Sequence, residues 1–398
     1  MPTVSLSDRT ILFVNIAHAF DHFVLLIYPT AVIAIAAERG LDYSDLIGLA
    51  TGAFVAFGLC SLPMGWLADR FGRRNMLGVF FIGYGASCLA MTLAHSSWTL
   101  AGCLLTLGIF SAIYHPIGSA MLVTHARKLG RDLGWNGVWG NLGAAAASAV
   151  TAGLTALFGW RMAFALPGAL CLLCGLAFLR AVPDDGNTAE KGKAAPRQQA
   201  VSRPLALLAV FAMAIVAGGM TFNVTTIAMP KVIDERIGLD LSLALTGSLA
   251  TGVFMLGALT QLTIGRLLDR FPLPDIFVAL AALQPLGLCI AAASTGVPLL
   301  FGLVLVTAAI YGQVVVNDAM VARYVPAEYR AKAFSLRYFL GFTASGFAAP
   351  LIAALHARGG FPIVLGATAG FGAVVLGCAL TFRALASLRS GAGAVAAE

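Results

Sequence analysis

The sequence predicts an all-α membrane protein in which twelve transmembrane helices form two pseudo-symmetric six-helix bundles. Hydrophobic residues make up 59% of the 398-residue chain and charged residues only 11%, whereas a soluble protein carries about 25% charged residues. The apolar residues gather in runs close to the roughly 20 residues that cross a hydrocarbon core of about 30 Å. These runs lack the alternation of polar and apolar residues that is typical of a membrane β-barrel.

Twelve such runs can be placed along the chain, and each is long enough for one membrane-spanning helix. They cover residues 10–36, 45–68, 75–94, 97–124, 133–158, 161–181, 205–230, 241–268, 275–293, 297–322, 329–357 and 361–385. The seven cysteines all fall within these runs, and we expect them to pack as small apolar side chains without disulfides. The first run is too long for the apolar part of a signal peptide, so we expect it to be retained.

The distribution of basic residues predicts the orientation of the chain. With the N-terminus in the cytoplasm, most lysines and arginines fall in cytoplasmic loops, as the positive-inside rule requires. Both termini are then cytoplasmic, and we expect a multi-pass protein of a bacterial inner membrane. The net charge of +7 is spread over short loops and forms no continuous basic face, so no nucleic-acid partner is expected.

A polar segment, PDDGNTAEKGKAAPRQQAVSRP, covers residues 183–204 and separates the sixth run from the seventh. Its charge, proline and alanine content predicts a flexible cytoplasmic linker. The linker divides the chain into an N-terminal bundle, residues 1–182, and a C-terminal bundle, residues 205–398. Each half contains the motif G-x-L-x-D-R-F, as GWLADRF at 65–71 and as GRLLDRF at 265–271, which predicts an internal repeat.

The longer loop GWLADRFGRR, residues 65–74, resembles the signature loop between the second and third helices of the major facilitator superfamily. Its glycines let helix ends approach closely, and its aspartate and arginines can pair across neighbouring helix ends. The resemblance implies a charge network that holds one face of a transporter shut and breaks on opening. The residues to which it assigns this gating role are Asp69, Arg70 and Arg73, with Asp269 in the second copy of the motif.

The stretch 107–145 is similar to the fosmidomycin-resistance-like branch of that superfamily. It contains a His-Pro pair at His115 in the fourth run and a G-N-x-G motif around Asn141 in the fifth. A histidine, an aspartate three residues later and then a proline in the first run also fit that branch. The chain departs from many drug/proton antiporters, since its fourth run lacks their basic residue and AAAASAV follows Gly143 where they have Gly-Pro.

The first run carries polar side chains that a membrane-spanning helix must keep away from lipid. Asn15, His18 and His22 share one helical stripe, and Asp21 lies beside it. At 1.5 Å per residue, Asp21 and His22 lie roughly 17 Å from the start of the run, close to the membrane midplane. An ionised carboxylate at that depth costs at least about 2.5–3.5 kcal/mol, so Asp21 must face water or a partner.

His115 lies at a similar depth in the fourth run, roughly 15 Å from its cytoplasmic end. Pro116 follows it, and because proline has no N–H we expect a kink and a free backbone carbonyl at Ala112. In the superfamily the first, fourth, seventh and tenth helices line the central cavity, so the resemblance implies that His115 and Asp21 converge.

Three interpretations of this polar patch are open. Protonation of Asp21, of His115 or of the two first-run histidines can be linked to substrate binding. Alternatively, a hydrogen-bonded pair only holds two helices together. The three histidines and Asp21 are also chemically able to bind a divalent transition metal, although we assign no resident metal site.

The second half offers hydrogen-bonding side chains but little charge within its runs, and we expect it to shape and read the substrate. The residues concerned are Asn223 in the seventh run and Tyr311, Gln313 and Asn317 in the tenth. Asp318 lies near the cytoplasmic end of the tenth run, where we expect a gating ion pair. Arg337 lies about two turns inside the eleventh run, where an unpaired cation is costly. It therefore binds an anion, pairs with Asp318 or extends to the inner surface.

Two bundles around a midplane site predict a secondary active transporter that works by alternating access. The sequence contains no P-loop, so an ion gradient must supply the energy, and the titratable residues make protons the expected coupling ion. We expect proton-coupled export of a small polar or anionic organic solute or drug. A divalent-metal exporter and a non-transporting membrane receptor or scaffold are the alternatives.

The remaining expectations concern chemistry and assembly. Neither H-E-x-x-H nor a convincing Ser/His nucleophile pair occurs, so the chain is not expected to be an enzyme. No cofactor is expected. The expected partners are a small-molecule substrate, protons and the lipid bilayer, and the expected oligomeric state is a monomer.

Overall fold

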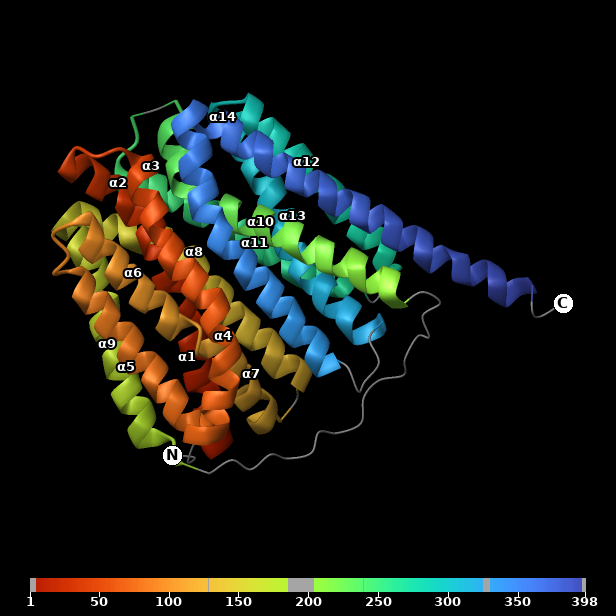
Figure 1. The fold of residues 1–398 in the computed structure, drawn as a ribbon, viewed down its shortest axis with the longest axis horizontal. Helices are drawn as coiled ribbons and strands as arrows, with labels where there is room; N and C mark the ends of the chain where they lie inside the picture. The colour runs from red at the N-terminus through yellow and green to blue at the C-terminus, as the bar shows by residue number, and fades with distance from the viewer. Residues whose placement is uncertain are drawn as a thin grey trace.

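The computed structural model describes residues 5–127, 129–184, 204–238, 240–268, 270–324 and 330–395, and all regular structure in these ranges is helical (Figure 1). The helices before the linker are α1 (Leu6–Leu25), α2 (Ile27–Arg39), α3 (Tyr43–Ile47), the 3₁₀ turn η1 (Gly48–Ala50), α4 (Thr51–Phe71), α5 (Arg73–Met91), α6 (Ser97–Ser111), α7 (Tyr114–His125), α8 (Leu129–Phe158) and α9 (Trp160–Ala181). Those after the linker are α10 (Pro204–Arg236), α11 (Leu243–Leu268), α12 (Leu273–Ala293), α13 (Gly296–Tyr324) and α14 (Arg330–Val395).

Ten segments of the described chain are helical, long and apolar enough to cross a membrane. The all-helical membrane class is confirmed, whereas the predicted count of twelve spans is not. Two predicted spans, 329–357 and 361–385, fall within α14, whose backbone is non-helical at Gly359 and Gly360. The predicted span 75–94 corresponds to α5, a helix of 19 residues that is not among the ten.

Large apolar side chains remain exposed on the outer surface of the molecule. Leu62, Leu173 and Leu259 are each more than half exposed. In water such a surface would be costly, but in a bilayer these side chains face lipid tails of similar polarity. The surface therefore agrees with a multi-pass membrane protein.

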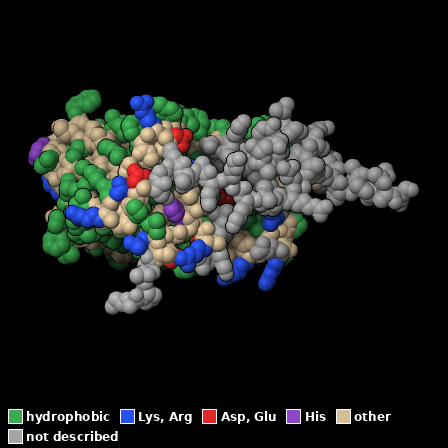
Figure 2. Space-filling model, turned by 90° about the horizontal axis from the view of Figure 1, so that it is seen from below, with side chains coloured by type: hydrophobic (Ala, Val, Ile, Leu, Met, Phe, Trp, Pro, Cys, Tyr) green, Lys and Arg blue, Asp and Glu red, His purple; other side chains and the backbone are tan. Residues whose placement is uncertain are grey.

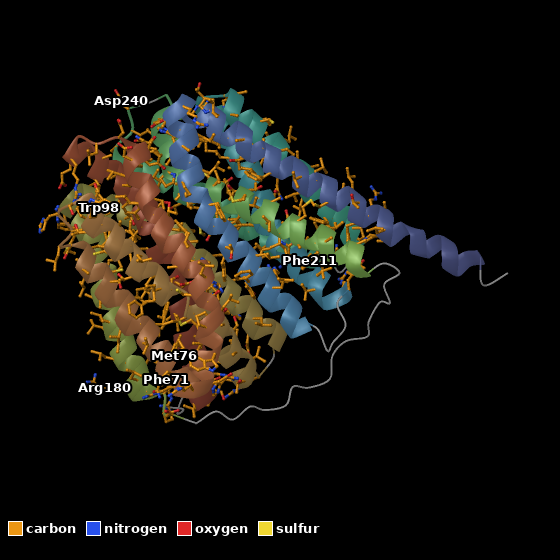
Figure 3. All side chains as sticks on the ribbon, in the orientation of Figure 1. Phe71, Met76, Trp98, Arg180, Phe211 and Asp240 are labelled. Atoms are coloured by element: carbon orange, nitrogen blue, oxygen red, sulfur yellow. The ribbon has the colours of Figure 1, made fainter. Side chains whose placement is uncertain are left out.

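Labelled residues mark the two ends of the molecule in Figure 3. Phe71 and Arg180 mark the end at which α4 and α9 finish, and Trp98 and Asp240 mark the opposite end (Figure 3). We call the first the linker end, because the linker follows α9. Figure 2 views this face and shows basic side chains set among apolar ones. Arg127, two residues after the end of α7, is more than half exposed and pairs with Asp8 at 3.0 Å.

A helix break shapes the region between α6 and α7. Helix α6 ends at Ser111 and α7 begins at Tyr114. Pro116 explains the break, because it cannot donate a hydrogen bond to the carbonyl of Ala112. The helix is thus interrupted close to the predicted kink, and Ala112 and Ile113 in the interruption keep right-handed helical dihedral angles.

The two halves of the chain make an equivalent contact. In each half it lies at the end of the molecule opposite the linker end. Arg39, the last residue of α2, donates to the carbonyl of Ala94 at 2.9 Å. Arg236, the last residue of α10, donates to the carbonyls of Ala291 and Ala292 at 2.9 and 3.0 Å. In both halves an arginine at a helix end thereby satisfies carbonyls left free where another helix finishes.

The halves contact one another chiefly through α8 against α11 and α4 against α14. Within the first half, α1 packs along α8. A side-chain carbon at Gly143 of α8 would overlap the backbone carbonyl of Ala19 in α1, so the absence of a side chain allows the two helices to approach. This contact holds α1, and its polar residues, against α8.

We expect Gly143→Ala to lower the thermal stability of the purified protein, because the added methyl group has no space between α1 and α8. Overpacking of this kind costs about 1–3 kcal/mol. Gly153→Ala on the same helix is the matched control, since no atom lies within 4 Å of its added carbon. Thermal unfolding in detergent measures both variants, and a Gly143→Ala protein as stable as the control would contradict the packing.

Candidate functional site

The described polar side chains converge in the first half, around Asp21 of α1. Asp21 is fully buried. Its Oδ1 accepts a hydrogen bond from Ser111 Oγ at 2.5 Å, and its Oδ2 lies 3.3 Å from His115 Nε2. The Tyr84 hydroxyl donates to the backbone carbonyl of Asp21 at 3.0 Å. Helices α5, α6 and α7 thus all contribute a partner to one residue of α1.

Ser111 and His115 reach the same carboxylate because they are four residues apart and lie on one side of the α6–α7 segment. Ser111 is the last residue of α6 and His115 is the second residue of α7. They contact different oxygens of Asp21. The His115 side chain is 12% exposed and that of Asp21 only 1% exposed, so this carboxylate has little access to solvent.

His18 and His22 lie one turn apart on α1, and their Nε2 atoms are 3.1 Å apart. His18 Nδ1 lies 2.8 Å from the backbone carbonyl of Asn136 in α8. A carbonyl oxygen can only accept, so His18 Nδ1 carries a proton. The His18 ring also stacks on Tyr114, with centroids 4.8 Å apart.

The amide of Asn136 in α8 and the hydroxyl of Tyr114 in α7 hold this arrangement. Asn136 Nδ2 donates to Asn15 Oδ1 at 2.9 Å and lies 3.0 Å from the Tyr114 hydroxyl. Gly140, one turn further along α8, leaves space for His18, because a side-chain carbon there would lie 2.6 Å from His18 Nε2. Asn15, predicted as a member of the patch, is therefore linked to the histidines through α8.

Sequence analysis missed Ser111, Asn136, Tyr114 and Tyr84. The sequence contains a sign that Asn136 is a site residue, because it is an amide within an apolar run. It contains no such sign for Ser111, since a serine in an apolar helix commonly bonds a carbonyl of its own preceding turn. Its contact with Asp21 depends on how α6 lies against α1.

Aromatic residues of α14, in the second half, cover His115. The ring centroids of Phe342 and Tyr338 lie 4.8 and 5.9 Å from that of His115. Phe342 also packs on Phe57 of α4 at 4.3 Å. A side-chain carbon at Gly58 would lie 2.8 Å from the carbonyl oxygen of Phe342, so the glycine lets α14 approach. The polar cluster therefore borders the contact between the halves.

The predicted polar residues of the second half are not brought to Asp21. Tyr311 stacks on Phe222, with centroids 5.5 Å apart. Asn223 donates to the carbonyl of Gly219 in its own helix at 2.8 Å. Asn141, predicted with the first-half patch, instead donates to Gln261 of α11 at 2.5 Å across the halves.

Gln313 and Asn317, one turn apart on α13, keep polar atoms without partners. Gln313 accepts a hydrogen bond from Gln284 of α12. Gln313 Nε2 and Asn317 Oδ1 are buried, and neither has a hydrogen-bond partner within the described part of the chain. A buried amide without a partner is costly, so these two atoms are able to bind a polar ligand.

Arg337 forms an ion pair with Asp318. It also donates to the carbonyl of Val314 at 3.4 Å, and its guanidinium lies 5.2 Å from the ring centroid of Tyr338. Arg337 is 8% exposed. Of the three alternatives drawn from the sequence, the structure shows the pair with Asp318.

The residues assigned to gating lie at the linker end. Arg73 donates to Thr124 Oγ1 at 3.2 Å and thereby joins α5 to α7 within the first half. Arg70 and Asp69 are exposed at the end of α4. The guanidinium of Arg70 lies 5.7 Å from the ring centroid of Phe71. Asp269 lies outside the described residues, so the gating roles stay predictions.

A second polar contact joins the halves at the opposite end, and sequence analysis missed it. His356 of α14 bonds Ser44 of α3 through Nδ1 at 2.9 Å. Through Nε2 it bonds Glu235 of α10 at 3.1 Å. Lys231 lies 3.5 Å from the same glutamate. The side chain of His356 therefore connects the two halves.

Comparison with known families and proteins gives consistent matches. Residues 11–247 and 219–393 match the family described as Major Facilitator Superfamily. Among curated relatives, the membrane sensor protein UhpC of Escherichia coli (strain K12) is 24% identical over 164 residues, 40% of this chain and 37% of the relative. The probable L-galactonate transporter of the same organism is 25% identical over 150 residues, 37% of this chain and 33% of the relative. The match thus spans about a third of each relative's length.

Solved structures resemble the chain over nearly its whole length. A bacterial homolog of the human lysosomal transporter Spinster, inward-facing and unoccupied, has a TM-score of 0.77 at 14% identity and covers 96% of this chain and 99% of its own. The xylose transporter XylE from E. coli, in an inward open conformation, has a TM-score of 0.72 at 14% identity, covering 93% and 94%. Likeness at this identity establishes the fold.

We expect Asp318→Ala to destabilise the protein more than Arg337→Met. The first change leaves a buried cation without its partner, whereas the second leaves a carboxylate that is 45% exposed. Breaking a buried pair costs about 3–5 kcal/mol, and we expect Asp318→Ala to fall near the lower value. The double variant removes both charges and should recover part of the loss in thermal unfolding. Equal losses in the two single variants would contradict this account.

Proposed function

Because the chain belongs to the Major Facilitator Superfamily, we propose that it is a secondary active transporter that exports a small polar or anionic organic solute in exchange for protons. The family comprises transporters rather than enzymes. The observation that carries the coupling is the buried contact of Asp21 with His115, 3.3 Å between Oδ2 and Nε2.

The Asp21–His115 pair is suited to holding one proton. With one proton the pair has no net charge, whether as an ion pair or as two neutral groups. With none it carries a buried negative charge, and with two a buried positive charge, and either is costly at membrane depth. A change in the number of protons therefore requires a change in the surroundings of the pair.

Movement of the aromatic residues of the second half that cover His115 would change the surroundings of the pair. Phe342 and Tyr338 of α14 lie against His115, so a movement of α14 away from α4 and α7 would expose the histidine to water. Proton exchange is then possible in one arrangement of the halves and hindered in the other. This linkage is what alternating access with a coupled proton requires.

The chemistry of the cluster supports a polar or anionic solute. Three imidazoles attract an anion when any of them is protonated. In the second half, Gln313 Nε2 and Asn317 Oδ1 are buried polar atoms without partners among the described residues. The name of one relative, the probable L-galactonate transporter, denotes a carboxylate substrate for that protein.

The proposed domain boundaries and orientation follow from the sequence. An N-terminal bundle, residues 1–182, and a C-terminal bundle, residues 205–398, rock about one another, and residues 183–204 connect them in the cytoplasm. The linker end then faces the cytoplasm of a bacterium, whose inner membrane holds the protein. The paired contacts of Arg39 and Arg236 support two halves of common design.

A membrane receptor without transport is the second candidate. A relative that matches 40% of the chain is named as a membrane sensor protein. Both candidates use the same fold, and they differ in whether solute crosses the membrane. Transport by reconstituted protein decides between them.

We expect Asp21→Asn to abolish protection of an efflux-deficient bacterial host against the solute that the protein exports. The host is challenged with phosphonates, biocides, organic acids and transition metals. The amide cannot exchange the proton, so transport loses its coupling to the proton gradient. His115→Ala should behave alike, whereas Asp8→Asn, an exposed aspartate of the same helix, should protect as the unmodified protein does.

Proteoliposomes provide the decisive measurement for Asp21. Transport of the identified solute is driven by a pH gradient, and protein orientation and amount are matched between variants. If Asp21→Asn retained the full gradient-driven rate, the assignment of Asp21 as a proton carrier would be wrong. A rate that is independent of the gradient in the unmodified protein would exclude proton coupling altogether.

We expect a covalent link between the halves at the opposite end to stop transport. Ser44 and His356 are in side-chain contact at 2.9 Å, so cysteines at both positions can be joined by a short bifunctional thiol reagent after the native cysteines are replaced with serine. The linked protein cannot separate its halves at that end. Each single-cysteine variant, treated with the same reagent, is the control, and full activity of the linked protein would argue against alternating access.

A further inference from the structure

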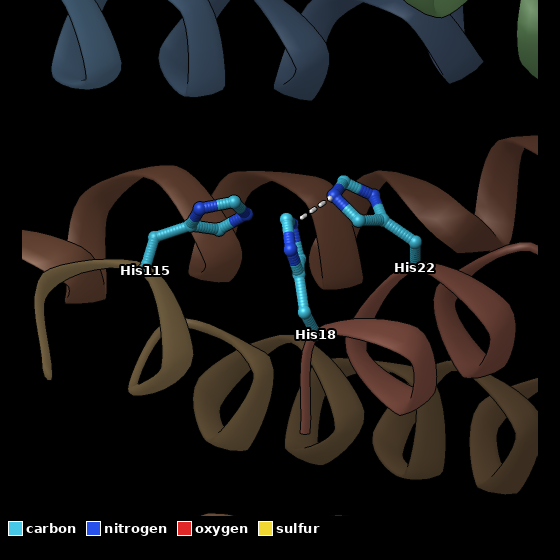
Figure 4. Close-up of side chains that lie close together, drawn as sticks. All are labelled: His18, His22 and His115. Atoms are coloured by element: carbon cyan, nitrogen blue, oxygen red, sulfur yellow. Dashed lines mark hydrogen bonds between the residues drawn. The ribbon is translucent and has the colours of Figure 1, made fainter. Parts of the chain in front are cut away.

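Three histidines face one another in the polar cluster (Figure 4). His18 and His22 lie on α1, and His115 lies on α7. One ring nitrogen from each lies within 4.8 Å of the other two. The ring of His115 is 5.5 Å from each of the other two rings, measured between centroids. Three potential nitrogen ligands from two helices therefore surround one point.

The spacing of the nitrogens suits a transition-metal ion. Zn²⁺ binds imidazole nitrogen at about 2.0–2.1 Å in tetrahedral geometry, which places two such nitrogens about 3.3 Å apart. The Nε2 atoms of His18 and His22 are 3.1 Å apart. For His115 a side-chain rotation that moves its nitrogen by about 1–2 Å is sufficient.

The partners of the histidines orient them for binding. His18 donates from Nδ1 to the carbonyl of Asn136, so its Nε2 keeps a lone pair directed at the cluster. Asn136 is itself held by Tyr114 and Asn15. His115 lies against the carboxylate of Asp21. A carbonyl or carboxylate behind an imidazole, as His18 and His115 have here, is the usual arrangement around metal-binding histidines.

A hydrogen bond alone does not explain the cluster. It accounts for the approach of His18 to His22, and the contact with Asp21 places His115, but neither requires that nitrogens of all three rings lie within 4.8 Å of one another. The Nε2 of His115 and the Oδ2 of Asp21 are buried, and neither makes a hydrogen bond to any described residue. A dication bound by the three imidazoles would be balanced by this carboxylate.

We propose that His18, His22 and His115 bind a divalent transition-metal ion of the kind that prefers imidazole, such as Zn²⁺ or Co²⁺. Imidazole ligands favour these ions over Mg²⁺ and Ca²⁺, which prefer oxygen. The ion and the protons compete for the same nitrogens, so binding releases protons and weakens in acid. This site goes beyond the proposed organic-solute export and is tested without measuring transport.

Calorimetric titration of the purified, detergent-solubilised full chain with Zn²⁺ alone, after removal of any purification tag, measures the binding. We expect one ion per chain, and a loss of affinity of more than about tenfold in His18→Ala and in His115→Ala. His95→Ala is the matched control, because His95 is exposed and is not among the three clustered histidines. Mg²⁺ should give no heat.

Two further measurements separate binding from misfolding. Zn²⁺ should raise the thermal unfolding temperature of the unmodified protein by mass action, whereas His18→Ala should unfold at one temperature with or without the ion. Bound Co²⁺ should show the intense visible absorption of a tetrahedral site, and that absorption should be absent in His115→Ala.

The absence of heat with Zn²⁺ or Co²⁺ at micromolar protein would overturn the proposal. So would binding that persists unchanged in a well-folded His18→Ala, His115→Ala double variant, because the ion would then lie elsewhere. Neither result decides proton-coupled transport, which rests on the Asp21–His115 pair and is measured with organic solutes in proteoliposomes. The two proposals can therefore fail separately.

Discussion

The buried carboxylate of Asp21 imposes the constraint on which the first half of the molecule depends. An ionised carboxylate within the membrane costs at least about 2.5–3.5 kcal/mol unless it is paired. The chain meets this cost with a hydroxyl from Ser111, an imidazole from His115 and, at the backbone carbonyl, the hydroxyl of Tyr84. These partners come from three helices, so the polar contact also fixes α1 against its neighbours. Ser111 and His115 stand on either side of the break between α6 and α7, and they contact different oxygens of the carboxylate.

His115 combines two tasks in one side chain. One edge of its ring lies against Asp21, and the ring also packs against Phe342 and Tyr338 from the other half. Charge at the site and contact between the halves are therefore physically linked. At the opposite end, His356 makes a comparable bridge between Ser44 and Glu235.

The two halves share their framework but not their chemistry. Arginines at the ends of α2 and α10 make equivalent contacts to backbone carbonyls, which depend on helix geometry alone. The clustered histidines lie only in the first half, within the described residues. The second half contributes amides, aromatic rings and the pair of Arg337 with Asp318. The first half holds the buried pair of Asp21 with His115. Aromatic rings of the second half cover that pair.

The sequence by itself determined the all-helical membrane class, and it predicted a kink near Pro116 and a similar depth for Asp21 and His115. These follow from run length, apolarity and a rise of 1.5 Å per residue, which are local properties of the chain. The predicted count of twelve spans is not confirmed. Only the tertiary structure decided that Ser111 and Asn136 complete the cluster, that Asn141 bonds Gln261 and that Arg337 pairs with Asp318. The partner that a buried polar group finds depends on how helices distant in sequence rotate and cross. The hydrophobic periodicity of the chain does not encode those rotations and crossing angles.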